Sequence, residues 1–262
     1  MLPEDGAGAA LETAARLGPY FAWQRRDGQD GWRPLADLLD PEVVAERVAA
    51  GQQVIMRMSG LGRDEIGERV VASTIFLGLA ARLLSPLLAA AALTDMVPLA
   101  DPGRLWWRPV EGGPVPIAYD RLDRAVGDAA PVLTSTAVDG LVRPVLEVFR
   151  ARFTLSPQVL WGNVASALGG AAGMIADNAS EAGAAERGAG IVAGMLAVPP
   201  LRGTATLHRP DPEHARWFLT RNNCCLYYRI PGGGTCGDCV LTPADERRRH
   251  WLSLGVRDVR GS

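Results

Sequence analysis

The chain has 262 residues, of which 48% are hydrophobic and 21% are charged, and its formal net charge is −2. This composition is typical of a folded globular protein and excludes a disordered chain. The small negative net charge gives no overall basic field of the kind that binds nucleic acid, so we expect no nucleic-acid partner.

Helical periodicity dominates the sequence, because apolar residues recur at three- and four-residue spacings and capping residues mark several helix starts. Helices are predicted over residues 4–18, 40–50, 64–84, 85–95, 134–152, 158–178, 184–196 and from 242 onward. We expect Gly51 to end the second helix and Ser85-Pro86 to separate the third from the fourth. The small residues at 165–173 favour close helix packing over a phosphate-binding loop, because their glycines do not match a nucleotide motif.

Strand signals are fewer. Residues 104–110 and 114–119 flank a Glu-Gly-Gly turn and predict a small hairpin, which its prolines should confine to edge positions or shorten. Further short strands are predicted at 204–207 and 226–230, and residues 201–220 look otherwise irregular. The expected fold class is therefore α+β and mainly helical: helices packed with a small antiparallel β element and a C-terminal cysteine-rich segment.

Two features bear on location. The first ten residues are acidic and lead into no apolar run, so we expect no signal peptide. The most apolar region, residues 70–99, is interrupted by Arg82, Pro86 and Asp95, so we expect no transmembrane segment, which needs about 18 clean apolar residues. The sequence thus predicts a cytoplasmic protein.

All four cysteines lie within one short segment near the C-terminal end, and they follow the pattern C-C-x10-C-x2-C: Cys224, Cys225, Cys236 and Cys239. Clustered cysteines in a reducing compartment indicate metal ligands rather than disulfides. The two residues between Cys236 and Cys239 give a knuckle that can direct both sulfurs at one metal. Four thiolates suit zinc or an iron–sulfur cluster. The adjacent first pair can serve a single ion only if the backbone bends, which favours the wider [2Fe–2S] cluster.

Residues 221–239 resemble the C-terminal signature of the FhuF-type ferric-siderophore reductase family, in cysteine spacing and in the Cys-Gly-Asp-Cys sequence at 236–239. Residues 160–163 (Leu-Trp-Gly-Asn) are similar to a short Trp-x-Asn element upstream in that family. The resemblance implies a [2Fe–2S] cluster on the four cysteines and one-electron reduction of siderophore-bound Fe³⁺ to Fe²⁺. It also implies a ferric siderophore of the hydroxamate type as substrate and a reduced ferredoxin or similar electron donor. Residues 242–262 depart from the pattern, because family members often end just after the last cysteine.

No catalytic residue is expected beyond the cluster ligands. The residues that could tune the cluster, shield it from water or bind the chelate are Arg221, Arg229, Tyr228, Trp161 and Asn163. The alternatives are an ordinary surface ion pair for each arginine and core packing for each aromatic ring.

The predicted organisation has three parts: a mainly helical siderophore-reductase-like domain at 1–220, a cluster-binding segment at 221–241 and a C-terminal helical tail at 242–262. Two other functions stay open, a zinc-stabilised binding protein without redox chemistry and an iron- or redox-sensing cluster protein. The arginine run at 247–249 is a basic helix face that solvent or an acidic partner could cover.

Overall fold

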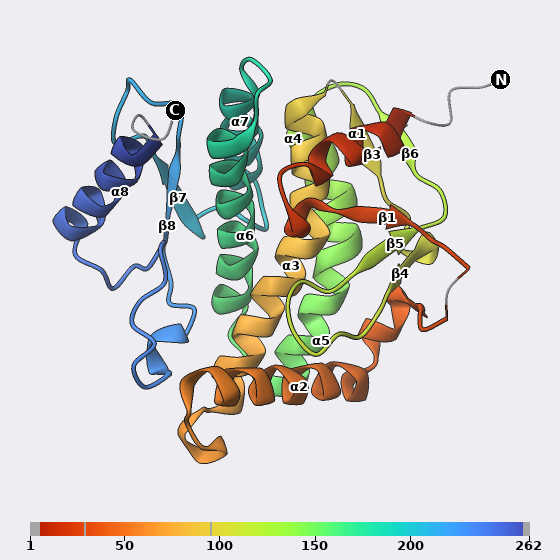
Figure 1. The fold of residues 1–262 in the computed structure, drawn as a ribbon, viewed down its shortest axis with the longest axis vertical. Helices are drawn as coiled ribbons and strands as arrows, with labels where there is room; N and C mark the ends of the chain where they lie inside the picture. The colour runs from red at the N-terminus through yellow and green to blue at the C-terminus, as the bar shows by residue number, and fades with distance from the viewer. Residues whose placement is uncertain (1–5, 29, 95, 259–262) are drawn as a thin grey trace.

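The computed structural model describes residues 6–28, 30–94 and 96–258. Two long helices, α3 (Glu68–Leu93) and α6 (Pro157–Asn178), run side by side through the middle of the molecule (Figure 1). Strands β1, β4 and β5 lie on one flank of this pair, and β7, β8 and α8 lie on the other (Figure 1). The fold is α+β and mainly helical, as predicted.

The other helices cover these two or extend from their ends. The α-helices are α1 (Gly6–Ala15), α2 (Pro41–Ser59), α4 (Ala129–Leu133), α5 (Arg143–Phe153), α7 (Ala184–Leu196) and α8 (Ala244–Asp258). A π-helical stretch, Thr134–Val142, joins α4 to α5. Single 3₁₀ turns are Pro19–Phe21, Leu35–Leu39, Arg63–Glu65, Pro102–Arg104 and Tyr227–Arg229. The predicted start of the first helix and the last four residues of the tail lie outside the described residues.

The strands form three small sheets. They are β1 (Trp23–Arg25), β2 (Arg33–Pro34), β3 (Val97–Leu99), β4 (Leu105–Trp107), β5 (Ile117–Tyr119), β6 (Asp123–Ala125), β7 (Ala205–His208) and β8 (Phe218–Arg221). One sheet has the order β1-β5-β4-β2, with β1 and β5 parallel and the other neighbours antiparallel. The pairs β3–β6 and β7–β8 are antiparallel.

The predicted hairpin exists, and its strands are shortened rather than confined to an edge. Strands β4 and β5 pair with Leu105 opposite Tyr119, and both are interior strands of the four-stranded sheet. Pro109, Pro114 and Pro116 fall between the two strands and take no ladder position, so each strand is shorter than the segment that was predicted.

Helix α2 runs nine residues further than predicted, because Gly51 does not end it. Gly51 instead gives room to α3, since a Cβ at that position would lie 2.3 Å from Ile75 Cδ1. The helix ends at Ser59, and Gly60 closes it with a left-handed φ of 72° and an N–H bond to the Met56 carbonyl.

Helix α3 is continuous across Pro86, where two helices had been expected. A proline within a helix leaves the carbonyl four residues earlier without its usual donor. Here that carbonyl belongs to Arg82, and the Trp23 indole N–H donates to it at 2.8 Å. The side chain of Trp23 thus replaces the missing backbone bond, and the helix continues to Leu93.

The helix predicted at 134–152 begins earlier and contains the π-helical stretch. Asp128 caps its start by accepting the Ala130 N–H at 3.1 Å, so the first turn precedes the apolar repeat. The helices predicted at 158–178 and 184–196 are confirmed as α6 and α7, and Ser156 caps α6 by accepting the Gln158 N–H.

By length and composition alone, α3 and α6 are apolar enough to cross a membrane, with mean hydropathies of 1.9 and 1.4. Within the molecule, 78% of that stretch of α3 and 67% of that of α6 are buried by other elements. The burial is what a core helix of a folded domain requires, and such helices meet the same length and composition test.

Candidate metal centre

Strand β8 leads the chain directly into the cysteine segment, which we define as residues 224–239. Two glycines of α6 allow the strand and the segment to lie against the helix. A Cβ on Gly169 would lie 2.7 Å from the Leu219 Cβ, and a Cβ on Gly162 would lie 2.1 Å from the Asn223 side-chain oxygen. The small-residue stretch of α6 therefore packs closely, as predicted, against α3 and against β8, the strand that leads into the cysteine segment.

The cysteine segment is a series of turns, and the strand predicted at 226–230 is wrong. Leu226 has a left-handed φ of 72°, and a single 3₁₀ turn, Tyr227–Arg229, follows it. The Leu226 N–H donates to Cys224 Sγ at 3.2 Å, and the Leu241 N–H donates to Cys239 Sγ at 3.4 Å. The backbone therefore bends just after Cys224 and Cys225. Such a bend is what these two adjacent sulfurs need in order to face the same metal site.

The structure brings Cys225 and Cys236 into contact, with 3.4 Å between their sulfurs. A disulfide would require about 2.05 Å. Two thiolates on one tetrahedral metal, each about 2.3 Å from it, lie roughly 3.8 Å apart. The separation is thus close to that of two ligands of one metal. The knuckle expected between Cys236 and Cys239 is a turn in which the Cys239 N–H donates to the Cys236 carbonyl at 3.1 Å.

The four thiols influence one another electrostatically. The Cys225 and Cys236 sulfurs share a hydrogen bond, which lowers the pKa of Cys225 to about 6 and raises the pKa of Cys236. Burial raises the pKa of Cys224, and the nearby sulfurs of Cys225 and Cys239 raise it further. Of the three thiols whose pKa is shifted, Cys225 is the one that forms a thiolate at the lowest pH.

Arg221 is a buried cation beside these sulfurs, with none of its surface exposed. One terminal nitrogen donates to the Asn163 side-chain oxygen at 2.6 Å and to the Val159 carbonyl at 3.3 Å. Its Nε and its other terminal nitrogen have no hydrogen-bond partner, and no carboxylate pairs with it, among the described residues. The charge of Arg221 favours the thiolate forms of Cys224 and Cys225, although burial still leaves the pKa of Cys224 raised. An unpaired buried charge is costly, so Arg221 favours an anion beside it.

A hydrogen-bond chain fixes Arg221 and the cysteine segment to the two core helices. Asn163 of α6 donates to the carbonyl and the hydroxyl oxygen of Ser73 on α3, at 2.9 and 3.0 Å. The Ser73 hydroxyl donates to the Cys225 carbonyl at 2.8 Å. Asn163 and Ser73 are both fully buried. Ser73 had no signal in the sequence, because a serine within an apolar helix resembles any other core position.

The other residues expected near the cysteines lie in different surroundings. Trp161 is half-buried on α6, with the Arg143 guanidinium 4.9 Å above its ring. Tyr228 is 45% exposed, and its role of shielding the site from water stays a prediction. Arg229 is exposed and donates to the Tyr228 hydroxyl at 3.3 Å, a contact that raises the pKa of Arg229, with a smaller contribution from Cys224.

The predicted tail helix, α8, docks against the site. Arg247 donates to the carbonyls of Cys239 and Thr242, at 3.1 and 2.9 Å. Trp251 stacks on Phe218 of β8 with 5.1 Å between ring centroids, and it also contacts His208 of β7. The first arginine of the run at 247–249 therefore contacts the chain itself.

Residues 221–241 match the family model of the FhuF 2Fe-2S C-terminal domain. The FhuF-type match covers all four cysteines together with the buried Arg221. No curated protein matches the chain.

The residues present fit a [2Fe–2S] group in donor type and in charge. Among the residues that the structure describes, no three His, Cys, Asp or Glu side chains converge on the position of one metal ion. A closed zinc site requires four ligands on one ion, whereas a [2Fe–2S] cluster requires two at each iron. A contacting pair of sulfurs with two more cysteines nearby suits the cluster better.

Proposed function

We propose that the protein is a ferric-siderophore reductase that holds a [2Fe–2S] cluster on its four cysteines and works in the cytoplasm. Cys225 and Cys236 would bind one iron, since their sulfurs already lie 3.4 Å apart, and Cys224 and Cys239 would bind the other. The FhuF-type match over residues 221–241 supports this assignment. Such a cluster supplies one-electron chemistry: an external donor such as a reduced ferredoxin provides each electron, and one siderophore-bound Fe³⁺ becomes Fe²⁺.

The oxygen ligands of the siderophore explain why reduction of the iron releases it. Hydroxamate oxygens are hard ligands that favour Fe³⁺, and they hold Fe²⁺ far less tightly. A protein that transfers one electron therefore releases the iron without breaking a covalent bond of the siderophore.

The chain contributes charge, hydrogen bonds and controlled access. Arg221 stabilises negative charge at the sulfurs, and therefore favours the reduced form of the centre. The N–H groups of Leu226 and Leu241 donate to two of the sulfurs. Cys225 and Cys239 are buried, whereas Cys224 and Cys236 are half-buried. Cys224 and Cys236 are therefore the ligands that a siderophore or a donor can reach.

Exposed apolar side chains lie within a few residues of the cysteines in the sequence. Tyr228 is 45% exposed, and Val240 and Leu241, just after the last cysteine, are 40% and 53% exposed. Apolar groups at a surface favour contact with a partner. We infer that the siderophore or the electron donor approaches here.

The observation that carries the proposal is the buried, carboxylate-free Arg221 next to four clustered cysteines within the FhuF-type match. The test is to reduce the purified protein without air, remove the reductant and add a ferric hydroxamate siderophore. We expect the centre to reoxidise while Fe²⁺ accumulates in a ferrous chelator, with one Fe²⁺ for each electron stored. A Cys225→Ser variant provides the control that lacks the centre. Reduced protein that keeps its spectrum and yields no Fe²⁺ rules out the reductase.

A further inference from the structure

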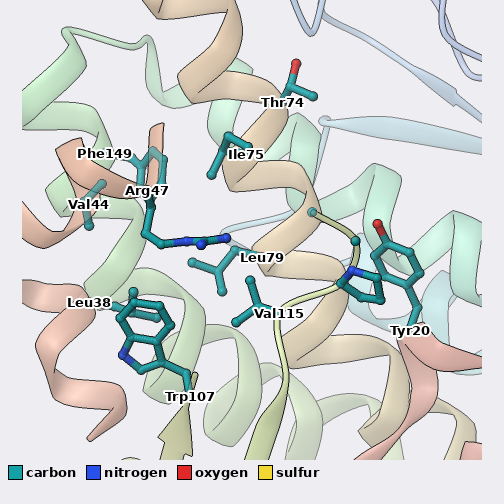
Figure 2. A pocket seen from close by; sticks show the side chains of 13 residues that line it. Tyr20, Leu38, Val44, Arg47, Thr74, Ile75, Leu79, Trp107, Val115 and Phe149 are labelled. Carbon is teal, nitrogen blue, oxygen red and sulfur yellow. The ribbon is translucent and has the colours of Figure 1, made fainter. Parts of the chain in front are cut away.

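A cavity of about 190 Å³ lies on the side of the molecule formed by α2, α3, α5 and the β4–β5 hairpin. Its walls are mainly apolar side chains: Val44, Ile75, Leu79, Trp107, Val115 and Phe149. Figure 2 shows the Arg47 side chain reaching from α2 into the space between Ile75, Leu79 and Trp107. A guanidinium in an apolar cavity is the feature to explain.

Arg47 has few partners for a half-buried cation. It donates one hydrogen bond, to the Val110 carbonyl at 3.1 Å, and lies 5.7 Å from the centroid of the Trp107 ring. Among the described residues, no carboxylate pairs with Arg47 and no acidic side chain lines the cavity. Arg33 lies over the same indole at 5.2 Å and has a carboxylate, that of Asp37 at 2.9 Å. Burial lowers the pKa of Arg47, but a guanidinium stays charged.

The cavity is held open by a second arginine, which uses its donors fully. Arg82 donates to the carbonyls of Val115 and Tyr20, each at 2.7 Å, and both residues line the cavity. It also donates to the Pro19 and Ala22 carbonyls, at 2.8 and 2.7 Å. Arg82 thus fixes two walls of the cavity. Arg47, with one hydrogen bond among the described residues, keeps most of its N–H groups for a ligand.

A glycine keeps the α3 side of the cavity empty. Gly78 lies in the middle of α3 and lines the cavity, and a Cβ built on it would meet nothing within 4 Å. Glycine weakens a helix interior relative to alanine. No packing contact requires glycine at this position, so its effect is to keep the space open.

We propose that this cavity binds a small carboxylate whose apolar body is about the size of one aromatic ring. A guanidinium pairs with a carboxylate through parallel N–H···O bonds, which Arg47 is free to donate. A cavity of about 150 Å³ holds benzene, and pockets for drug-sized ligands start at roughly 300 Å³. The space therefore suits one ring and a carboxylate, and it is too small for a complete ferric siderophore.

This site shares no lining residue with the cysteine segment. The two are neighbours along α3, since Ser73 contacts Cys225 and the next residue, Thr74, lines the cavity. Binding here can therefore be measured without reference to the metal centre, and its outcome is independent of the reductase proposal.

The experiment is calorimetric titration of the purified protein with benzoate, and with benzamide as a neutral molecule of the same shape. We expect saturable one-to-one binding of benzoate and at least about tenfold weaker binding of benzamide, because a charge-assisted pair is lost. Arg47→Leu should weaken benzoate binding by at least about tenfold. Arg57→Leu, an exposed arginine on the same helix, should leave it unchanged.

Gly78→Leu is a second variant that fills the cavity without removing the charge, and it should abolish benzoate binding while α3 gains helix propensity. Absence of saturable binding by the wild-type protein at millimolar benzoate overturns the proposal. Equal affinities for benzoate and benzamide, or benzoate binding that survives both Arg47→Leu and Gly78→Leu, overturn it as well.

Discussion

Replacing Asn163 with alanine should destabilise the whole fold, because this one amide joins α3, α6 and Arg221. The variant loses a charge-assisted bond from Arg221 at 2.6 Å, worth about 1.5–3 kcal/mol. It also loses two contacts with Ser73 at 2.9 and 3.0 Å, worth roughly 1 kcal/mol each. The free energy of unfolding should therefore fall by about 3–5 kcal/mol, and the melting temperature by roughly 10 °C.

The assay is urea unfolding of anaerobically purified protein, followed by far-ultraviolet circular dichroism. Asn178→Ala is the matched control, since Asn178 is exposed on the same helix and bonds only locally, to the Met174 carbonyl at 3.0 Å. The control should change stability by less than about 0.5 kcal/mol. If the two variants unfold within 1 kcal/mol of each other, Asn163 does not hold the site together as argued.

Three further predictions follow from the same structure. Arg221→Leu should retain the cluster and lower its reduction potential by roughly 100 mV, since one charge across 5–10 Å at a dielectric constant of about 20 is worth about 2–3 kcal/mol; an unchanged potential in a redox titration contradicts the role of this charge. Gly162→Ala should cost about 1–3 kcal/mol by colliding with Asn223, whereas Gly170→Ala on the same helix has open space and should be neutral or stabilising by up to about 1 kcal/mol; thermal melts compare them. Burial, and after it the charge of Arg247, lowers the pKa of His208 below its usual 6.5. Docking of α8 should therefore be complete above pH 6.5 and weaken as the pH falls below it. Hydrogen exchange in α8, corrected for intrinsic rates, should show this pH dependence in the wild-type protein and lose it in His208→Phe.

The sequence was sufficient for the parts of the fold that depend on local chemistry. Apolar spacing and the Ser156 cap predicted α6, and the Glu-Gly-Gly turn predicted the β4–β5 pair. The capping and turn residues could be recognised in the sequence because each one acts on residues only a few positions away. The four cysteines were visible for the same reason, since all lie in one short segment.

The errors came from contacts between distant residues. Pro86 was expected to divide a helix, because nothing near it shows that the Trp23 indole takes over the vacant carbonyl of Arg82. Gly51 was expected to end α2, because its packing against Ile75 of α3 is a tertiary contact. Arg221 was a candidate from its position near the cysteines, but its complete burial depends on α6.

The most direct test of the central claim is the visible absorption spectrum of the protein purified without air, with iron and sulfide measured on the same sample. A [2Fe–2S] cluster on the four cysteines predicts a coloured protein with about two iron and two acid-labile sulfide per chain. Serine at any one of the four positions should remove the colour. A colourless protein that contains one zinc and no sulfide contradicts the assignment, and with it the electron-transfer function.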